Sequence, residues 1–87
     1  MHAVVATVRV DDFEVARQAL ADLRLDLVPR APGFVSAYWL EPVDNIGMSV
    51  IVFDTREHAQ EAMGYPLPPL PGVIPLTVEL REVLASA

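Results

Sequence analysis

The sequence of 87 residues contains no cysteine. Disulfide bonds and thiolate metal sites are therefore excluded. Lysine is also absent, the six arginines are never adjacent, and aspartate and glutamate bring the net charge to −6. Binding to nucleic acid or to an anionic membrane surface needs clustered cations. We therefore expect neither nucleic acid nor membrane among the partners.

Long apolar runs are missing as well. No segment approaches the roughly 20 apolar residues that a membrane-spanning helix requires. The first residues, Met1 to Val5, lack the basic region and the cleavage site of a secretory signal peptide. The sequence therefore predicts a soluble cytoplasmic protein.

Apolar residues, by contrast, make up 53% of the chain. Soluble domains are typically about 45–50% apolar. A chain of this length is expected to form one domain over residues 1–87, and such a domain buries only about 60–65% of the surface that its unfolded chain exposes. The excess of apolar residues predicts that more surface is buried than one copy can bury alone.

The apolar pattern changes along the first half of the chain from strand-like to helix-like. Residues 2–10 are short and β-branched, which is typical of a buried strand. Asp11 and Glu14 then have the spacing of a capping box at the start of a helix over residues 12–27. Spacings of three and four mark one apolar face of this helix, formed by Phe13, Ala16, Leu20, Leu23 and Leu27.

The second half predicts a hairpin, a short helix and a last strand. The expected elements are strands at 34–41 and 48–53, a hairpin loop at 42–47, a helix at 55–63 and a strand at 76–84. Asp54 and Glu57 repeat the capping spacing before the second helix, and Gly64 ends it. The order βαββαβ predicts an α+β, ferredoxin-like fold, with a four-stranded antiparallel sheet and two helices on one face.

Residues 66–75 hold five prolines in ten positions. Such a segment cannot be a helix or a central strand. We interpret it as a stiff connector, or as an arm that crosses to a partner subunit. Its PxxP spacings also suit an SH3-type ligand, although no basic residue adjoins them.

Two helices can cover only one face of a four-stranded sheet, yet the strands are apolar on both sides. Residues 2–10, for example, place Val4 and Val8 on one face and Ala3 and Val5 on the other. A bare apolar face is unusual on a monomer, and packing two sheets face to face would bury it. We therefore expect a homodimer through the open sheet face, formed by Val5, Val35, Ile51 and Phe53. The alternatives are a monomer with an exposed apolar face and a ligand that covers this face.

Residues 32–62, PGFVSAYWLEPVDNIGMSVIVFDTREHAQEA, resemble the dimeric α/β-barrel superfamily. More narrowly, they are similar to small proteins related to the antibiotic biosynthesis monooxygenases. The matching features are Pro32-Gly33-Phe34 at the start of a strand, the hairpin, and Ser49 to Phe53 followed by an acidic residue. The resemblance implies a homodimer whose sheets form a barrel, with a pocket in each monomer between the sheet and its helices. It says little about activity, because one fold hosts many chemistries.

The residues that perform chemistry in the best-known branches of that superfamily are mostly different here. Of the Asn, Trp and His used by the haem-degrading branch, only His58 can be carried over, and Phe53 lies where a tryptophan often ends the third strand. The single asparagine, Asn45, falls in the hairpin loop. We therefore expect no haem or other cofactor.

His58 and Tyr65 are the candidate catalytic residues. A general base needs a substrate proton within hydrogen-bond reach and a pKa near neutrality, which histidine offers. Tyr65 follows the second helix and suits hydrogen bonding to a bound carbonyl. The alternatives are a solvent-facing His58 in the first helical turn and a Tyr65 that packs against the proline segment.

The candidate ligand-binding residues are Trp39, Tyr38, Met48 and Met63. Trp39 suits stacking on a planar aromatic ligand, or equally a place in the core. Tyr38 and Trp39 point to opposite sheet faces, so only one of them lines any one pocket. No histidine spacing supports a metal site.

Glu79 and Arg81 share one face of the last strand. They are candidates for ion pairs between subunits if that face lies in the dimer, and they are solvated charges if it does not.

Three functions remain open on the sequence alone. One is a cofactor-independent, monooxygenase-like enzyme that acts on a small hydrophobic or aromatic substrate. Another is a non-catalytic module that binds or senses a small hydrophobic molecule. The last is a structural dimer without a ligand site.

Overall fold

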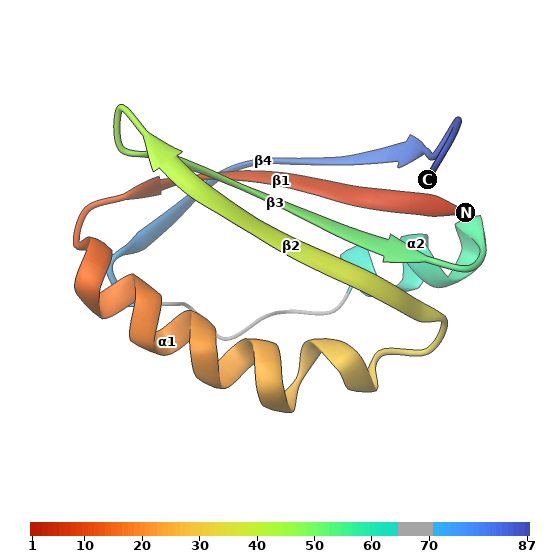
Figure 1. Cartoon of the computed structure of the whole chain (residues 1–87), viewed down its shortest axis with the longest axis horizontal. Coiled ribbons are helices and arrows are strands. Elements are labelled where there is room, and N and C mark those ends of the chain that lie inside the picture. The colour runs from red at the N-terminus through yellow and green to blue at the C-terminus, as the bar shows by residue number, and fades with distance from the viewer. Residues whose placement is uncertain (65–70) are drawn as a thin grey trace.

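A computed structural model describes residues 1–64 and 71–87, without the side chains of residues 23–25. Figure 1 shows a four-stranded antiparallel sheet with the helices gathered beneath one face. The elements are β1 His2–Val10, α1 Phe13–Asp26, the 3-10 turn η1 Val28–Arg30, β2 Phe34–Val43, β3 Ile46–Phe53, α2 Arg56–Gly64 and β4 Val73–Glu82. The strand order is β2-β3-β1-β4. The ferredoxin-like α+β fold is confirmed.

The cap of α1 lies one residue later than the sequence predicts. Asp12, and not Asp11, caps the helix, because its Oδ1 accepts the backbone N–H of Val15 at 3.2 Å. Asp11 instead makes its hydrogen bonds to residues of β1 and of the turn before β4. Its backbone N–H donates to the carbonyl of Gly72 at 2.8 Å, and its carboxylate accepts from Arg9 at 3.1 Å. The start of α1 is thereby joined to the start of β4.

The β2–β3 hairpin is tighter than the predicted loop over 42–47. Val43 pairs with Ile46, so only Asp44 and Asn45 form the turn. Their φ angles are 53° and 64°. Positive φ at both central residues is what a type I′ hairpin turn requires, and asparagine and aspartate tolerate it better than most residues.

β4 begins at Val73, three residues before the predicted start, and includes Pro75. Proline cannot donate to a ladder and is confined to edge strands and irregular positions. β4 is an edge strand, and Pro75 lies opposite Val8 where the register shifts. Pro75 thus occupies both an edge strand and an irregular position. The remainder of the proline segment, 66–70, lies outside the described residues.

The hydrophobic core lies between the sheet and α2. Val4 stands opposite Ile51 on β3 and Leu80 on β4, and directly paired residues share a sheet face. These side chains pack with Phe53, which is 2% exposed, and Ala59, which is fully buried. Small residues on α2, such as Ala59, allow the helix to approach the strands closely. This is the covered face of the sheet.

Ile51 and Phe53 therefore do not belong to the open face, contrary to the expectation from the sequence. The register pairs Val5 with Val50, so Ile51 falls on the side of Val4. Because side chains alternate along a strand, an error of one residue exchanges the two faces. Val35 is the extra residue at the irregularity between Phe34 and Ser36, and it is 47% exposed.

The open face is defined by the residues that pair with Ala3, Val5, Thr7 and Arg9 of β1 and by their own partners. Its other members are Ile46, Met48, Val50 and Val52 of β3, Ser36, Tyr38, Leu40 and Val43 of β2, and Ile74, Thr77, Glu79 and Arg81 of β4. Two of the four strands, β2 and β3, are mainly apolar on this face.

Replacing Phe53 by alanine is expected to lower the free energy of unfolding by about 3–5 kcal/mol, because a fully buried ring leaves a cavity. Urea denaturation followed by circular dichroism measures the change. Val35→Ala, at an exposed position, is the matched control and should cost less than about 0.5 kcal/mol. Equal losses in the two variants would contradict the assignment of the core.

Candidate functional site

A hydrogen-bonded Asp54–His58 pair lies at the start of α2. Thr55, and not the expected Asp54, caps this helix, since its Oγ1 accepts the backbone N–H of His58 at 3.1 Å. The Asp54 carboxylate is therefore available to the His58 side chain, and its Oδ1 lies 2.6 Å from His58 Nδ1. The backbone N–H of Asp54 donates to the carbonyl of Gly33 at 2.8 Å. The helix start is thus fixed to the start of β2.

Gly33 is required directly beneath this pair. A Cβ atom at position 33 would lie 2.2 Å from Asp54 Oδ1 and 2.3 Å from His58 Nδ1. The φ of Gly33 is +76°, in the region that glycine occupies without steric cost. The glycine before β2, which the sequence shows only as a strand start, therefore makes room for the two side chains.

The electrostatics of the pair favour its charged form. The hydrogen bond to Asp54 raises the pKa of His58 above its ordinary 6.5; desolvation opposes the shift, and the charges of Asp54, Glu61 and Glu57 add to it. The same hydrogen bond lowers the pKa of Asp54 below its ordinary 3.8. The side chains are 37% and 53% exposed, so solvent reaches both. With Nδ1 engaged, the Nε2 atom of His58 is the one left for proton exchange.

The other candidate residues from the sequence do not join His58. Trp39 is on the covered face, opposite Ser49, whereas Tyr38 and Met48 are on the open face. Gly33, next to His58, is six residues from Trp39, which is about 20 Å along a strand. Tyr65 lies outside the described residues. Among the described residues, His58, Trp39 and Tyr38 therefore do not line one common pocket.

Met63, the remaining candidate, lies near the end of α2. Its side chain is 39% exposed, and it does not line the groove described next.

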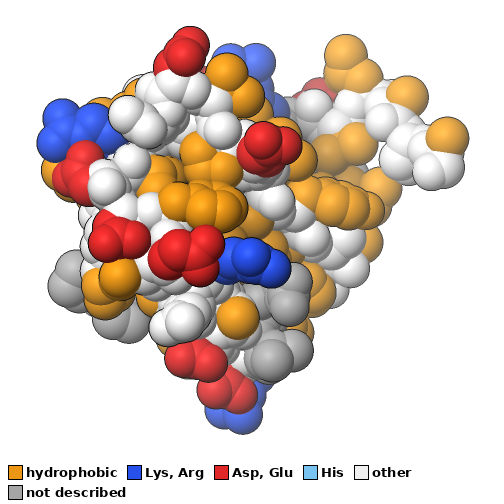
Figure 2. All heavy atoms as spheres, turned by 60° about the vertical axis from the view of Figure 1, so that its left-hand side comes forward, with side chains coloured by type: hydrophobic (Ala, Val, Ile, Leu, Met, Phe, Trp, Pro, Cys, Tyr) orange, Lys and Arg blue, Asp and Glu red, His pale blue; other side chains and the backbone are white. Residues whose placement is uncertain are grey.

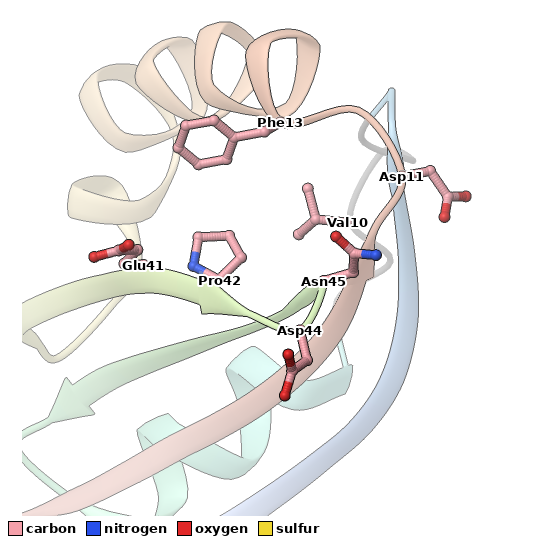
Figure 3. Close-up of a pocket in the computed structure, with 7 residues that line it drawn as sticks. All are labelled: Val10, Asp11, Phe13, Glu41, Pro42, Asp44 and Asn45. Carbon is pink, nitrogen blue, oxygen red and sulfur yellow. The ribbon is translucent and has the colours of Figure 1, made fainter.

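An open groove of about 460 Å³ lies at the opposite end of β1, between the start of α1 and the hairpin. Its lining residues are Val10, Asp11, Phe13, Glu41, Pro42, Asp44 and Asn45 (Figure 3). None of them was a sequence-based site candidate. The sequence contains one sign of this groove: Phe13 is the first residue of the apolar face of α1. The rest of the groove could not be predicted, because the hairpin comes close to Phe13 only in the folded chain. We call this site the hairpin groove.

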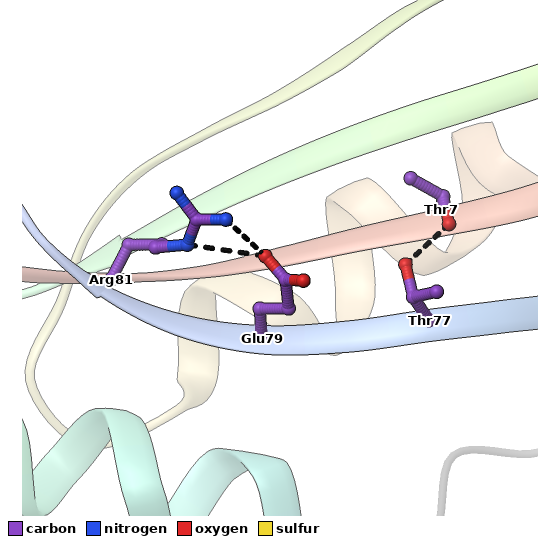
Figure 4. Close-up of polar contacts among 4 residues, drawn as sticks. All are labelled: Thr7, Thr77, Glu79 and Arg81. Atoms are coloured by element: carbon purple, nitrogen blue, oxygen red, sulfur yellow. Dashed lines mark hydrogen bonds and ion pairs between the residues drawn. The ribbon is translucent and has the colours of Figure 1, made fainter.

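Polar side chains on the open face gather along β1 and β4. Thr7 and Thr77 stand opposite each other and hydrogen-bond through their hydroxyls, and Arg81 donates to Glu79 Oε2 from Nε at 3.1 Å and from Nη2 at 2.6 Å (Figure 4). The Glu79–Arg81 pair is thus satisfied within one strand of one chain.

Within residues 1–64 and 71–87, no three His, Cys, Asp or Glu side chains are grouped so as to hold a metal ion. No helix in this part of the chain has the length and apolarity needed to cross a membrane.

Comparison with known proteins found no protein-family model, no curated protein and no solved structure that matches this chain. The fold assignment therefore depends on the structure itself.

Replacing Asp54 by asparagine is expected to return the pKa of His58 toward its ordinary value, because the hydrogen bond to a carboxylate is the largest cause of its rise. An NMR titration of the His58 ring protons measures this shift. Asp22→Asn removes an equal charge from the exposed surface of α1 and should leave the titration unchanged. An unaltered His58 titration in Asp54→Asn would contradict the pairing.

The stability difference between the natural chain and Asp54→Asn should also depend on pH. The contribution of Asp54 is complete above about pH 4 and is lost as pH falls through its lowered pKa. The contribution of His58 is complete below about pH 6.5 and is lost as pH rises through its raised pKa. The difference should therefore be largest between these two values, and urea denaturation across pH tests this.

Proposed function

We propose that this protein acts as a homodimer in which the open faces of two sheets pack together, as in the dimeric α/β barrels that it resembles. The observation that supports this is an apolar sheet face with no helix over it (Figure 1). Its side chains include Tyr38 at 59% exposure, Leu40 at 50% and Met48 at 41%. Soluble monomers rarely leave a contiguous patch of this kind in water.

The charges on the open face are compatible with packing against an identical face. Arg9 pairs with Asp11, and Glu79 pairs with Arg81. Arg9, Glu79 and Arg81, the charged side chains of the open face, thus each have an ion-pair partner within their own chain. Although the whole protein carries a charge of −6, this face adds little like-charge repulsion between two copies.

The size of the face also suits a dimer. The molecule measures 33 × 24 × 23 Å, and in Figure 1 the strands run along the longest dimension and succeed one another largely along the shortest. The sheet therefore presents at most roughly 750 Å², close to the ~800 Å² per partner of a standard stable interface. A second copy offers this area with the same shape and the same apolar character.

The same geometry favours a non-catalytic role. An enzyme on an aromatic substrate needs Trp39 or Tyr38 beside a proton-handling group such as His58. In the described part of the chain, Trp39 is about 20 Å along β2 from Gly33, the residue next to His58. Tyr38 lies on the opposite sheet face from Trp39. We therefore assign the chain the role of a self-associating module.

A charge placed at the centre of the open face should separate the subunits. Sedimentation equilibrium at micromolar concentration is expected to give the natural chain twice its mass of 9.5 kDa, and Tyr38→Glu a single mass. Tyr38 is 59% exposed, so its replacement should leave the monomer folded. Val15→Glu, at a 42% exposed position on α1, is the control and should remain dimeric. A natural chain that sediments as a monomer would refute the proposal.

A second candidate is proton transfer at His58 in a cofactor-independent, monooxygenase-like reaction, and the Asp54–His58 hydrogen bond of 2.6 Å favours it. Here the Nε2 atom would remove a hydroxyl proton from a small aromatic substrate that then reacts with O₂.

Oxygen consumption with a panel of aromatic quinols tests this second candidate. His58→Gln should lower the rate by about 100-fold, the usual contribution of a general base. Arg56→Gln, in the same helical turn, serves as the control. A rate that is unaffected by His58→Gln, or no consumption at all, would rule out this role.

A further inference from the structure

We propose that the hairpin groove binds a small organic cation with an apolar body, such as an arylalkylamine. The inference goes beyond the dimer and does not require it, because all residues that line the groove come from one chain. The groove is formed by the end of β1, the start of α1 and the β2–β3 hairpin, away from the centre of the open face.

The apolar part of the groove is a slot between two rings. Figure 3 shows the Phe13 ring, from the first residue of α1, facing the Pro42 ring of β2 with Val10 to one side. Phe13 is 51% exposed although it begins the apolar face of its helix, whereas Ala16, one turn later, is 8% exposed. A flat apolar group placed in the slot would bury the free side of this ring and stack on it.

Backbone hydrogen bonds hold the walls of the slot in place. The N–H of Val10 donates to the carbonyl of Asn45 at 2.7 Å, which ties the end of β1 to the hairpin turn. On the other wall, the Asp12 cap fixes the first turn of α1, where Phe13 stands. A site whose parts are held before binding loses less conformational entropy when a ligand enters.

The charge around the slot selects a cation. Glu41 and Asp44 line the groove, and neither has an ion-pair partner among the described residues. The third carboxylate, Asp11, is occupied by Arg9. In Figure 3 the carboxylates of Asp11 and Asp44 point away from the slot and that of Glu41 lies beside Pro42, so these charges act from the rim of the groove. Figure 2 shows the hairpin end of the molecule as an apolar surface with carboxylates, and fewer arginines, around it. This field attracts a positive ligand and repels a negative one, and the Phe13 ring adds a cation–π surface.

Three probes of one shape and different charge test the inference: benzylamine, benzyl alcohol and benzoate. Each is titrated at pH 7 into the ¹⁵N-labelled natural chain while the backbone amides are followed by NMR. Benzylamine should shift the amides of residues 10–13 and 41–45, with an affinity about fivefold higher than that of benzyl alcohol, since two exposed carboxylates contribute modestly. Benzoate should cause no shift, and added salt should weaken benzylamine alone.

Point variants separate the two parts of the site. Asp44→Asn and Glu41→Gln should each weaken benzylamine about two- to threefold and leave benzyl alcohol unchanged. Asparagine accepts the positive φ of position 44, so the hairpin turn is kept. Phe13→Ala should weaken both probes. Asp22→Asn, which removes the same charge from elsewhere on α1, should weaken neither.

The proposal is overturned if benzylamine gives no shifts or shifts residues away from the groove, or if benzoate binds as well as benzylamine. It is also overturned if a lysine-containing tripeptide binds more tightly than benzylamine, because the groove would then fit a protein partner. Sedimentation of the same samples measures dimer formation independently, so a lack of benzylamine binding can be told apart from a lack of dimerisation.

Discussion

The feature on which the rest of this structure depends is the mismatch between a sheet with two apolar faces and helices that cover one of them. Val4 and Phe53 are buried against α2 and Ile51 is partly buried there, whereas Val5, Val50 and Tyr38 on the reverse side meet no helix of the described residues. The described residues, 1–64 and 71–87, contain no further helix or strand that covers them. This face accommodates the apolar residues that exceed the needs of one small core, and the proposed second copy would cover it with a face of the same shape.

The two ends of the molecule differ in packing, as its two sheet faces do: one is closed and the other is open. At the α2 end the core is closed: Phe53 and Ala59 are buried, and Gly33 allows Asp54 and His58 to settle against the backbone. At the hairpin end the space between Phe13 and Pro42 is left open, and Glu41 and Asp44 lie at its rim. The polar pair therefore belongs to the well-packed end and the cavity to the other. This separation weakens an enzymatic interpretation, which needs both in one place, and strengthens one based on binding.

Much of the fold was predictable because it depends on local patterns, such as the alternation in β1 and the spacing of three and four in α1. The helix caps were misassigned by one residue, since spacing alone does not show which side chain caps: Asp12 accepts from the Val15 N–H, whereas the Asp11 carboxylate accepts from Arg9. The faces of β3 were misassigned because register is a property of strand pairs and not of one strand. The site was predicted least well: His58 was found, but its partner Asp54 had been expected as a cap, and the hairpin groove joins segments that no sequence spacing connects.

Intermolecular contacts across the open face test the central claim most directly. In a sample that mixes ¹³C-labelled and unlabelled chains, isotope-filtered NOE spectra report only contacts between different copies. The account predicts such contacts among Tyr38, Met48 and Val50, and none from the covered Phe53. Intermolecular NOEs that arise from α1, or an absence of any in a sample shown to be dimeric, would contradict it.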